Sequence, residues 1–198
     1  MEEQIELLNL SPLHLHEIIT KIKDLSILKD HLISTSKTFQ LYKDAVSQMS
    51  SNFRKLSTCI GGFPQFVSDP TIQSMARTLS NYAEIFSDHM SEVQEISNKL
   101  KEFVQNEVTD AEEKGKKAKH EIDQYFKFVE NYAMISKKKP QMTPQEAVGR
   151  LKSSHWTAVI SDFQYHRALE LVERKTLYEL TAQVCIFFSK FVIIFCYI

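Results

Sequence analysis

Turn-forming residues are scarce in this sequence, since glycine occurs four times and proline five times in 198 residues. A β-sandwich or an α/β fold of this length needs many more tight turns. Because few turns leave long elements between them, the composition predicts an all-α protein. The hydrophobic content of 43% is enough for one domain with a substantial core.

Cysteine is also scarce, and no segment resembles a signal peptide. The three cysteines, Cys59, Cys185 and Cys196, are odd in number and lack metal-ligand spacing, unlike a secreted disulfide framework. Residues 1–10 contain three glutamates and no lysine or arginine, so they predict neither a signal peptide nor a membrane-inserting amphipathic helix. We therefore expect a cytoplasmic protein in which residues 1–10 are a short leader.

Motifs of catalysis are absent as well. The sequence has no phosphate-binding glycine loop, no nucleophile elbow and no paired carboxylates at a plausible site. His14 and His16 lie two residues apart, which on a helix turns them about 160° away from each other. No other pair among the seven histidines has better ligand spacing. We therefore expect no enzyme activity, no cofactor and no metal site.

A seven-residue apolar repeat follows Ser11 and Pro12, which suit a helix start. One row contains Ile18, Leu25, Leu32, Phe39, Val46 and Phe53, and a second row contains Leu28, Tyr42, Met49 and Leu56. The repeat predicts one helix over residues 12–57. Two glycines and two prolines interrupt it between residues 59 and 70, where Ser68 or Asp69 can cap the next helix.

The second repeat predicts a helix over residues 70–136. Its rows contain Ile72, Leu79, Phe86, Val93 and Leu100, and Met75, Tyr82, Ile96 and Phe103. After Phe103 the phase slips by one residue, which we attribute to the drift of a straight helix against a seven-residue repeat. Gly115 lies on the continued stripe and predicts both a bend and a close helix approach.

A third helix is predicted over residues 144–198, beginning at Thr143 and Pro144 with Glu146 in its first turn. Trp156 and Phe163 have helical spacing and are expected in the core. The apolar run 182–198 is interrupted by Lys190 and is shorter than the roughly 20 residues of a membrane span, so its heptads favour a dimer seam over a span.

Three long helices with apolar stripes predict an elongated antiparallel three-helix coiled coil that forms a homodimer. The expected core and dimer seam contains Phe39, Val46, Phe53, Leu79, Phe86, Leu180 and Phe187.

The chain resembles a BAR domain, and within that family it is most similar to the BAR region of the GRAF and oligophrenin proteins, with the coiled-coil ArfGAPs as more distant relatives. The resemblance covers residues 11–188 and rests on these segments: Cys59 to Gly61, LKEFVQNEV from Leu100, KGKKAKHEIDQY from Lys114, ISKKK from Ile135, QEA from Gln145, SDFQY and ERKTLYEL. It implies a crescent-shaped homodimer that binds curved anionic membrane as a peripheral protein. The lipid-binding PH domain and GTPase-activating domain that follow in the family are absent, and the third helix ends in an apolar rather than a polar segment, as a truncated product or an altered splice end would.

Charge along the second helix reverses from acidic to basic. Residues 92–113 have a net charge of −5, and residues 114–139 have a net charge of +5. We predict contacts with anionic phospholipid headgroups by Lys114, Lys117, Lys119, Lys137, Lys138, Lys139, Arg150 and Lys152. The helical positions of Lys114 and Lys117 differ from those of Lys116 and Lys119, so a single membrane surface cannot contact all four.

Two alternatives remain open at this stage. The lysines can be a solvated helix face, and the heptads can belong to a dimeric scaffold that binds a small GTPase or an autoinhibited domain of a longer isoform. We expect no nucleic-acid partner.

Overall fold

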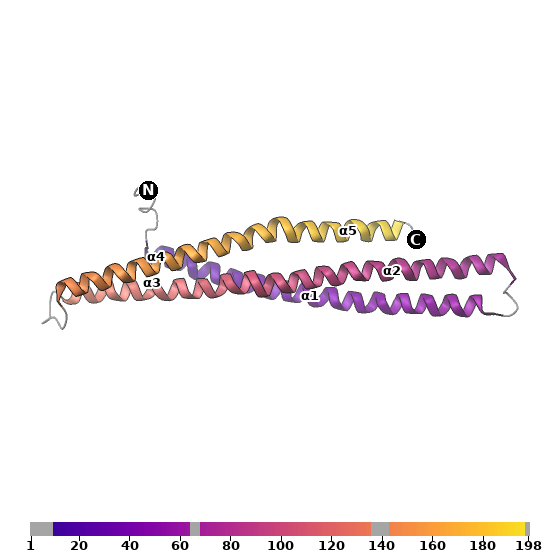
Figure 1. Ribbon diagram of the computed structural model, residues 1–198, viewed down its shortest axis with the longest axis horizontal. Coiled ribbons are helices and arrows are strands. Elements are labelled where there is room, and N and C mark those ends of the chain that lie inside the picture. The colour runs from indigo at the N-terminus through magenta and orange to yellow at the C-terminus, as the bar shows by residue number, and fades with distance from the viewer. Residues whose placement is uncertain (1–9, 64–67, 136–142, 197–198) are drawn as a thin grey trace. The chain divides into compact units, whose positions relative to one another are not determined.

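The computed structural model describes residues 10–63, 68–135 and 143–196 (Figure 1). They form three continuous helical segments: α1 (Pro12–Gly61); α2 (Pro70–Phe103), the π-helical turn η2 (Val104–Val108) and α3 (Thr109–Ile135); and α4 (Pro144–Arg174), the π-helical turn η3 (Lys175–Leu180) and α5 (Thr181–Cys196). These residues contain no β-strand, so the prediction of an all-α fold is confirmed. None of their helices has both the length and the hydropathy needed to cross a membrane.

The helix starts follow the caps expected from the sequence. Ser11 Oγ accepts a hydrogen bond of 3.1 Å from the backbone N–H of His14. Asp69 Oδ1 accepts one of 2.8 Å from the N–H two residues later. Thr143 and Glu146 form a reciprocal capping box before Pro144. At the other end, α1 continues past the predicted boundary at residue 57 to Gly61.

The phase slip after Phe103 is a turn of π-helix. In η2 the backbone N–H of Thr109 bonds to the carbonyl of Val104, five residues earlier. A π-turn bonds i to i+5 and so accommodates one extra residue. The apolar pattern therefore shifts by one position there, and gradual drift of a straight helix is not the cause. The second π-turn, η3, lies between α4 and α5 in the third helical segment.

The contacts divide the chain into two compact units. Unit 1 contains the beginning of α1 as far as Asp30 together with residues 103–176. In unit 1, α3 and α4 are antiparallel neighbours, because Gly115 approaches Tyr165 and, ten residues further along α3, Tyr125 contacts His155 ten residues earlier in α4.

Gly115 is the point of closest helix approach in unit 1. A Cβ atom placed on Gly115 would lie 2.8 Å from Ile22 Cγ1 and 2.9 Å from Tyr165 Cε2. Real carbon atoms do not approach that closely, so only glycine fits without a shift of its neighbours. The predicted close approach is confirmed, and the bend at Gly115 stays a prediction.

Unit 2 contains residues 31–102 and the segment from Leu177 onward. Ser36 Oγ donates to the Ser97 carbonyl at 3.2 Å, and Ser50 Oγ donates to the Ala83 carbonyl at 2.8 Å. From the first contact to the second, the chain moves forward along α1 and backward by the same number of residues along α2, so the two helices run antiparallel. Ser57 repeats the contact one heptad later with the Ala76 carbonyl at 2.7 Å.

These serines form a row of α1 that the apolar pattern did not predict. It lies four residues after the first row and faces α2 through Ser36, Ser50 and Ser57. In the predicted second row, Tyr42 also contacts His89 of α2, whereas Leu56 is exposed. Serine is small enough to let the two backbones approach, and its hydroxyl donates a hydrogen bond to a carbonyl oxygen of the opposite helix. A pattern that counts only apolar residues misses such a row.

The predicted seam residues all lie in unit 2. Val46, Phe86 and Phe187 are buried. The others are partly buried, and they are Phe39, Phe53, Leu79 and Leu180. Phe187 of α5 anchors an aromatic cluster, with its ring 5.3 Å from that of Phe39, 5.9 Å from Tyr42 and 5.3 Å from His89.

Candidate functional site

The outer face of α4 displays an apolar stripe to solvent. Trp156, Ile160 and Phe163 follow one another at helical spacing, and their side chains are 50%, 53% and 60% exposed. The expectation that Trp156 and Phe163 belong to the core is therefore wrong. At about 100° per residue, the buried side chains of Ala158 and Tyr165 fall on the opposite side of the helix, where α4 meets the rest of unit 1.

Cations lie at both ends of this stripe. Lys152 is one helical turn before Trp156, and Arg167 is one turn after Phe163. Both side chains are exposed, and neither has an ion pair among the residues that the structure describes. The α4 stripe, as we call Lys152, Trp156, Ile160, Phe163 and Arg167, thus combines exposed aromatic area with unpaired positive charge.

The lysines predicted on α3 differ in their pairing. Lys114 is half-buried and donates to Asp110 at 2.7 Å, one turn before it. Lys117 and Lys119 are exposed and have no recorded ion pair in the described segments. The sequence favoured Lys114 over Lys119 for membrane contact, but in the structure the charge of Lys114 is offset by a carboxylate whereas that of Lys119 is not.

The other cations predicted to contact the membrane are Arg150 and the three lysines of residues 137–139. Arg150 is exposed near the start of α4, where its charge acts on Glu146. Lys137, Lys138 and Lys139 lie outside the described residues.

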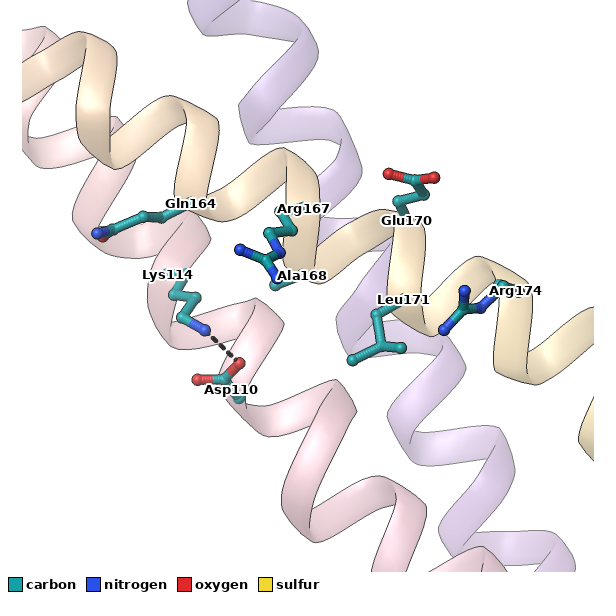
Figure 2. Close-up of a pocket in the computed structure, with 8 residues that line it drawn as sticks. All are labelled: Asp110, Lys114, Gln164, Arg167, Ala168, Glu170, Leu171 and Arg174. Carbon is teal, nitrogen blue, oxygen red and sulfur yellow. Dashed lines mark hydrogen bonds and ion pairs between the residues drawn. The ribbon is translucent and has the colours of Figure 1, made fainter.

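A polar groove separates α3 from α4 beside the stripe (Figure 2). It has a volume of about 540 Å³ and contains three cationic and two acidic side chains. Its lining residues are Asp110, Lys114, Gln164, Arg167, Ala168, Glu170, Leu171 and Arg174. Arg167 belongs both to the groove and to the α4 stripe, so the cationic character of the stripe continues into the groove. The groove presents charges for an anionic group but no nucleophile with a partner base.

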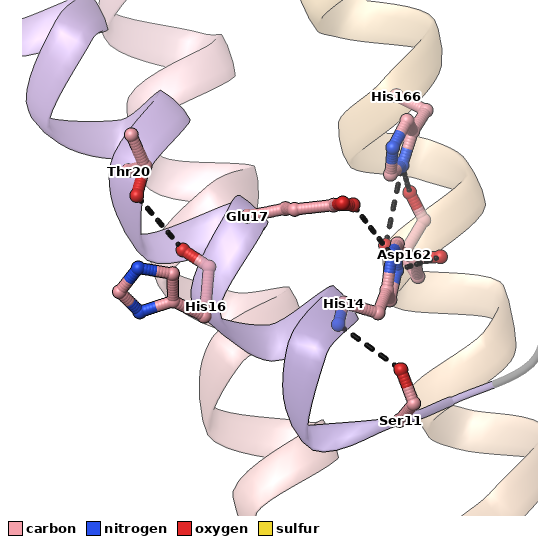
Figure 3. Close-up of polar contacts among 7 residues, drawn as sticks. All are labelled: Ser11, His14, His16, Glu17, Thr20, Asp162 and His166. Atoms are coloured by element: carbon pink, nitrogen blue, oxygen red, sulfur yellow. Dashed lines mark hydrogen bonds and ion pairs between the residues drawn. The ribbon is translucent and has the colours of Figure 1, made fainter.

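A cluster of His14, Asp162 and His166 was missed by the sequence analysis (Figure 3). His14 Nε2 lies 3.0 Å from Asp162 Oδ2, and His166 Nδ1 lies 3.2 Å from Asp162 Oδ1. The two imidazole rings stack with their centroids 5.6 Å apart. Asp162 is 0% exposed. The expectation that no histidines come together as potential ligands is therefore wrong.

The reason for the miss is the distance along the chain. His14 and Asp162 are 148 residues apart, and the spacing rules applied to the sequence covered only pairs of histidines. The four-residue spacing of Asp162 and His166, which puts both on one face of a helix, could have revealed half of the cluster.

The cluster is electrostatically coupled. Burial raises the pKa of Asp162, but hydrogen bonds with His166 and His14 outweigh burial and hold that pKa below its usual value. The hydrogen bond between Asp162 and His166 in turn raises the pKa of His166. Next to the cluster, burial raises the pKa of Tyr165 to about 12, so its hydroxyl remains neutral. The carboxylate of Asp162 is therefore a buried charge that depends on its imidazole neighbours.

Comparisons with known proteins assign no family, since no protein-family model matches the chain and no curated protein matches its sequence.

Proposed function

We propose that this protein is a non-enzymatic module that binds anionic phospholipid membranes as a homodimer, as its sequence resemblance to BAR domains implies. The observation that supports this best is the α4 stripe, in which Trp156 and Phe163 are exposed between Lys152 and Arg167. A soluble helix normally turns such aromatic side chains toward its core.

The chemistry of the stripe matches a lipid surface. Tryptophan and other aromatic side chains favour the level of the headgroups, where the ring meets the acyl boundary and polar atoms stay hydrated. Each lysine or arginine near an anionic leaflet contributes about 1 kcal/mol, which falls off within a Debye length. Lys117 or Lys119 of α3, which point to different sides of that helix, would add to this attraction where it faces the same surface. Binding should therefore require anionic lipid and weaken as salt rises.

Unit 2 has an exposed face of different character. Tyr178, Phe188 and Val192 are exposed along η3 and α5, on a side of the helix without lysine or arginine among the described side chains. An uncharged apolar face suits a second copy of this chain better than an anionic surface, because a symmetric interface places the same residues on both sides. The proposed homodimer, with its antiparallel coiled-coil and crescent form, would cover this face.

Co-sedimentation with vesicles tests the proposal. The full chain is mixed with phosphatidylcholine vesicles that contain or lack phosphatidylserine, and the bound fraction is measured at low and high salt. We expect binding only with phosphatidylserine. The pair Trp156→Ser and Phe163→Ser should weaken it at least tenfold, and Lys152→Glu should weaken it about fivefold or more, since about 1.4 kcal/mol corresponds to a factor of ten.

Lys101→Glu is the matched control, because Lys101 is an exposed lysine in the last turn of α2, outside unit 1. It makes the same change in net charge and should leave binding within twofold of the parent. Equal loss in Lys101→Glu and Lys152→Glu would contradict a localised surface. No binding by the parent chain, with light scattering still reporting a dimer, would favour a scaffold for a protein partner instead.

A further inference from the structure

The side chains of His14, Asp162 and His166 bring three potential metal ligands to one place. One ligand atom from each residue lies within 4.8 Å of both others. His14 belongs to the first turn of α1, whereas Asp162 and His166 are one turn apart on α4. The cluster therefore joins two helices that are far apart in sequence.

The spacing of these atoms matches a tetrahedral zinc site. With zinc bonds of about 2.0–2.1 Å, neighbouring ligand atoms of a tetrahedron are about 3.3 Å apart. Each imidazole nitrogen lies near this value from one of the two carboxylate oxygens, 3.0 Å for His14 with Oδ2 and 3.2 Å for His166 with Oδ1. An ion held by both rings would therefore bind one or both of these oxygens after a shift of the side chains.

The surroundings also have the features of a metal site. The other ring nitrogen of His14 lies 3.7 Å from a carboxylate oxygen of Glu17, so a small movement of the exposed Glu17 side chain would give the carboxylate contact that orients many ligating histidines. Ser11 caps the same turn by accepting the backbone N–H of His14. The backbone and ring of His14 are thus both positioned before any ion arrives.

Asp162 itself provides an independent sign of a missing partner. His166 Nδ1 lies 3.0 Å from the backbone carbonyl of Asp162. The same nitrogen lies 3.2 Å from the buried Oδ1 of Asp162, so one N–H of His166 has to serve two acceptors, and Oδ1 has no hydrogen bond of good geometry in the described part of the chain. A cation bound at Oδ1 would satisfy this buried carboxylate oxygen directly.

We propose that His14, Asp162 and His166 bind a zinc ion that fastens the first turn of α1 to α4. Two imidazole nitrogens and a carboxylate oxygen are ligands that zinc accepts, and water can fill the fourth position. Access for the ion and that water comes from the side of His166, which is 41% exposed and borders a groove of about 500 Å³. Binding releases any proton that the ligating nitrogen carries, while the other nitrogen of the ring keeps its own. This inference does not depend on membrane binding.

Isothermal titration of the full chain with zinc chloride, with its cysteines kept reduced, provides the test. We expect one equivalent of zinc to bind with micromolar or tighter affinity and to raise the melting temperature. Cobalt chloride should give the visible absorption of a tetrahedral or five-coordinate site. His14→Ala and His166→Gln should each weaken zinc binding at least tenfold.

His16→Ala is the matched control. His16 is exposed, lies two residues from His14 on the same helix, and its ring points away from the cluster in Figure 3. It should bind zinc within twofold of the parent chain. The proposal is overturned if the parent chain binds less than one equivalent, if His14→Ala binds as tightly as the parent, or if His16→Ala loses as much affinity as His14→Ala.

Discussion

The two units hold their helices together with different chemistry. In unit 2, serine hydroxyls of α1 donate to backbone carbonyls of α2, and Phe187 of α5 packs in an aromatic cluster. In unit 1, ion pairs join Lys29 of α1 with Glu112 of α3 and Lys175 with Glu107, and the His14 ring contacts the carboxylate of Asp162. Neutral hydrogen bonds and ring contacts respond little to salt and pH, whereas ion pairs respond to both.

This difference matches the proposed functions of the two units, membrane contact for unit 1 and dimer contact for unit 2. The exposed cations and aromatics of the α4 stripe belong to unit 1 and would meet a charged surface. The exposed apolar side chains of α5, as far as the structure describes them, belong to unit 2 and in the proposed dimer would meet a second copy. Unit 1 is therefore expected to change stability with ionic conditions, and unit 2 is expected to be indifferent to them.

The largest effect should come from removing the aromatic anchor of unit 2. Phe187 is 7% exposed and contacts the rings of Phe39, Tyr42 and His89 on the neighbouring helices, so Phe187→Ala leaves a cavity between α5 and its neighbours. We expect the free energy of unfolding to fall by about 3–5 kcal/mol, and the loss to be the same at low and high salt. Urea unfolding followed by circular dichroism at a fixed protein concentration measures both.

The adjacent Ile186 supplies the control. Its side chain is 48% exposed, so Ile186→Ala should cost less than about 1 kcal/mol. Similar losses for the two variants would mean that α5 does not pack through Phe187.

The next largest effect concerns the closest helix approach in unit 1. Gly115→Ala places a methyl group within 3 Å of the Ile22 and Tyr165 side chains, and these side chains or the helices that carry them must shift to admit it. We expect a loss of about 1–3 kcal/mol from overpacking, despite the better helix propensity of alanine. Thermal unfolding of the variant measures the loss.

Gly149 offers a glycine of the opposite kind. It lies in α4 with nothing within 4 Å of an added Cβ. Gly149→Ala should therefore stabilise the protein by about 0.5–1 kcal/mol. A gain in both variants would show that the approach at Gly115 is looser than the structure indicates.

The sequence predicted the fold through its caps, its heptads and its glycine. The starts at Ser11, Asp69 and Thr143 depend only on local hydrogen bonds, and local rules find them. Gly115 was recognised because a glycine on an apolar stripe has a steric meaning. The one-residue slip after Phe103 was visible in the pattern, but its origin in a π-turn required the backbone.

The candidate sites were harder to predict because they depend on neighbours distant in sequence. Heptad counting assigned Trp156 and Phe163 to the core, since spacing alone does not say which face of a helix is covered. The sequence favoured Lys114 over Lys119 for membrane contact, although Lys114 has a carboxylate one turn earlier that pairs with it and Lys119 does not. The contact of His14 with Asp162 follows from tertiary packing and has no local signal.

The smallest effect, and the sharpest comparison of the two units, comes from the ion pairs of Glu112. This carboxylate lies 3.1 Å from Lys29 across the helix interface and 2.5 Å from Lys116 on its own helix. Glu112→Gln should lower the free energy of unfolding by about 1 kcal/mol at low salt and by less at 1 M salt, where the Debye length is about 3 Å. Ser36→Ala in unit 2 should cost a similar amount, about 1 kcal/mol, but equally at both salt concentrations.

The pH dependence of the Glu112 effect has a definite sign. Hydrogen bonds from Lys116 and then Lys29 hold the pKa of Glu112 below its usual value of 4.5. A depressed pKa in the folded state means that the stabilising contribution is complete above pH 4.5 and is lost as the pH falls through the folded-state pKa. The difference in free energy of unfolding between the parent chain and Glu112→Gln should therefore be constant near neutral pH and shrink in acid.

The control is Glu113→Gln, which changes an adjacent exposed carboxylate that has no ion pair among the described residues. Its effect on the free energy of unfolding should depend on neither salt nor acid. If it depends on both, the effect belongs to the net charge of α3 and not to the contact with α1.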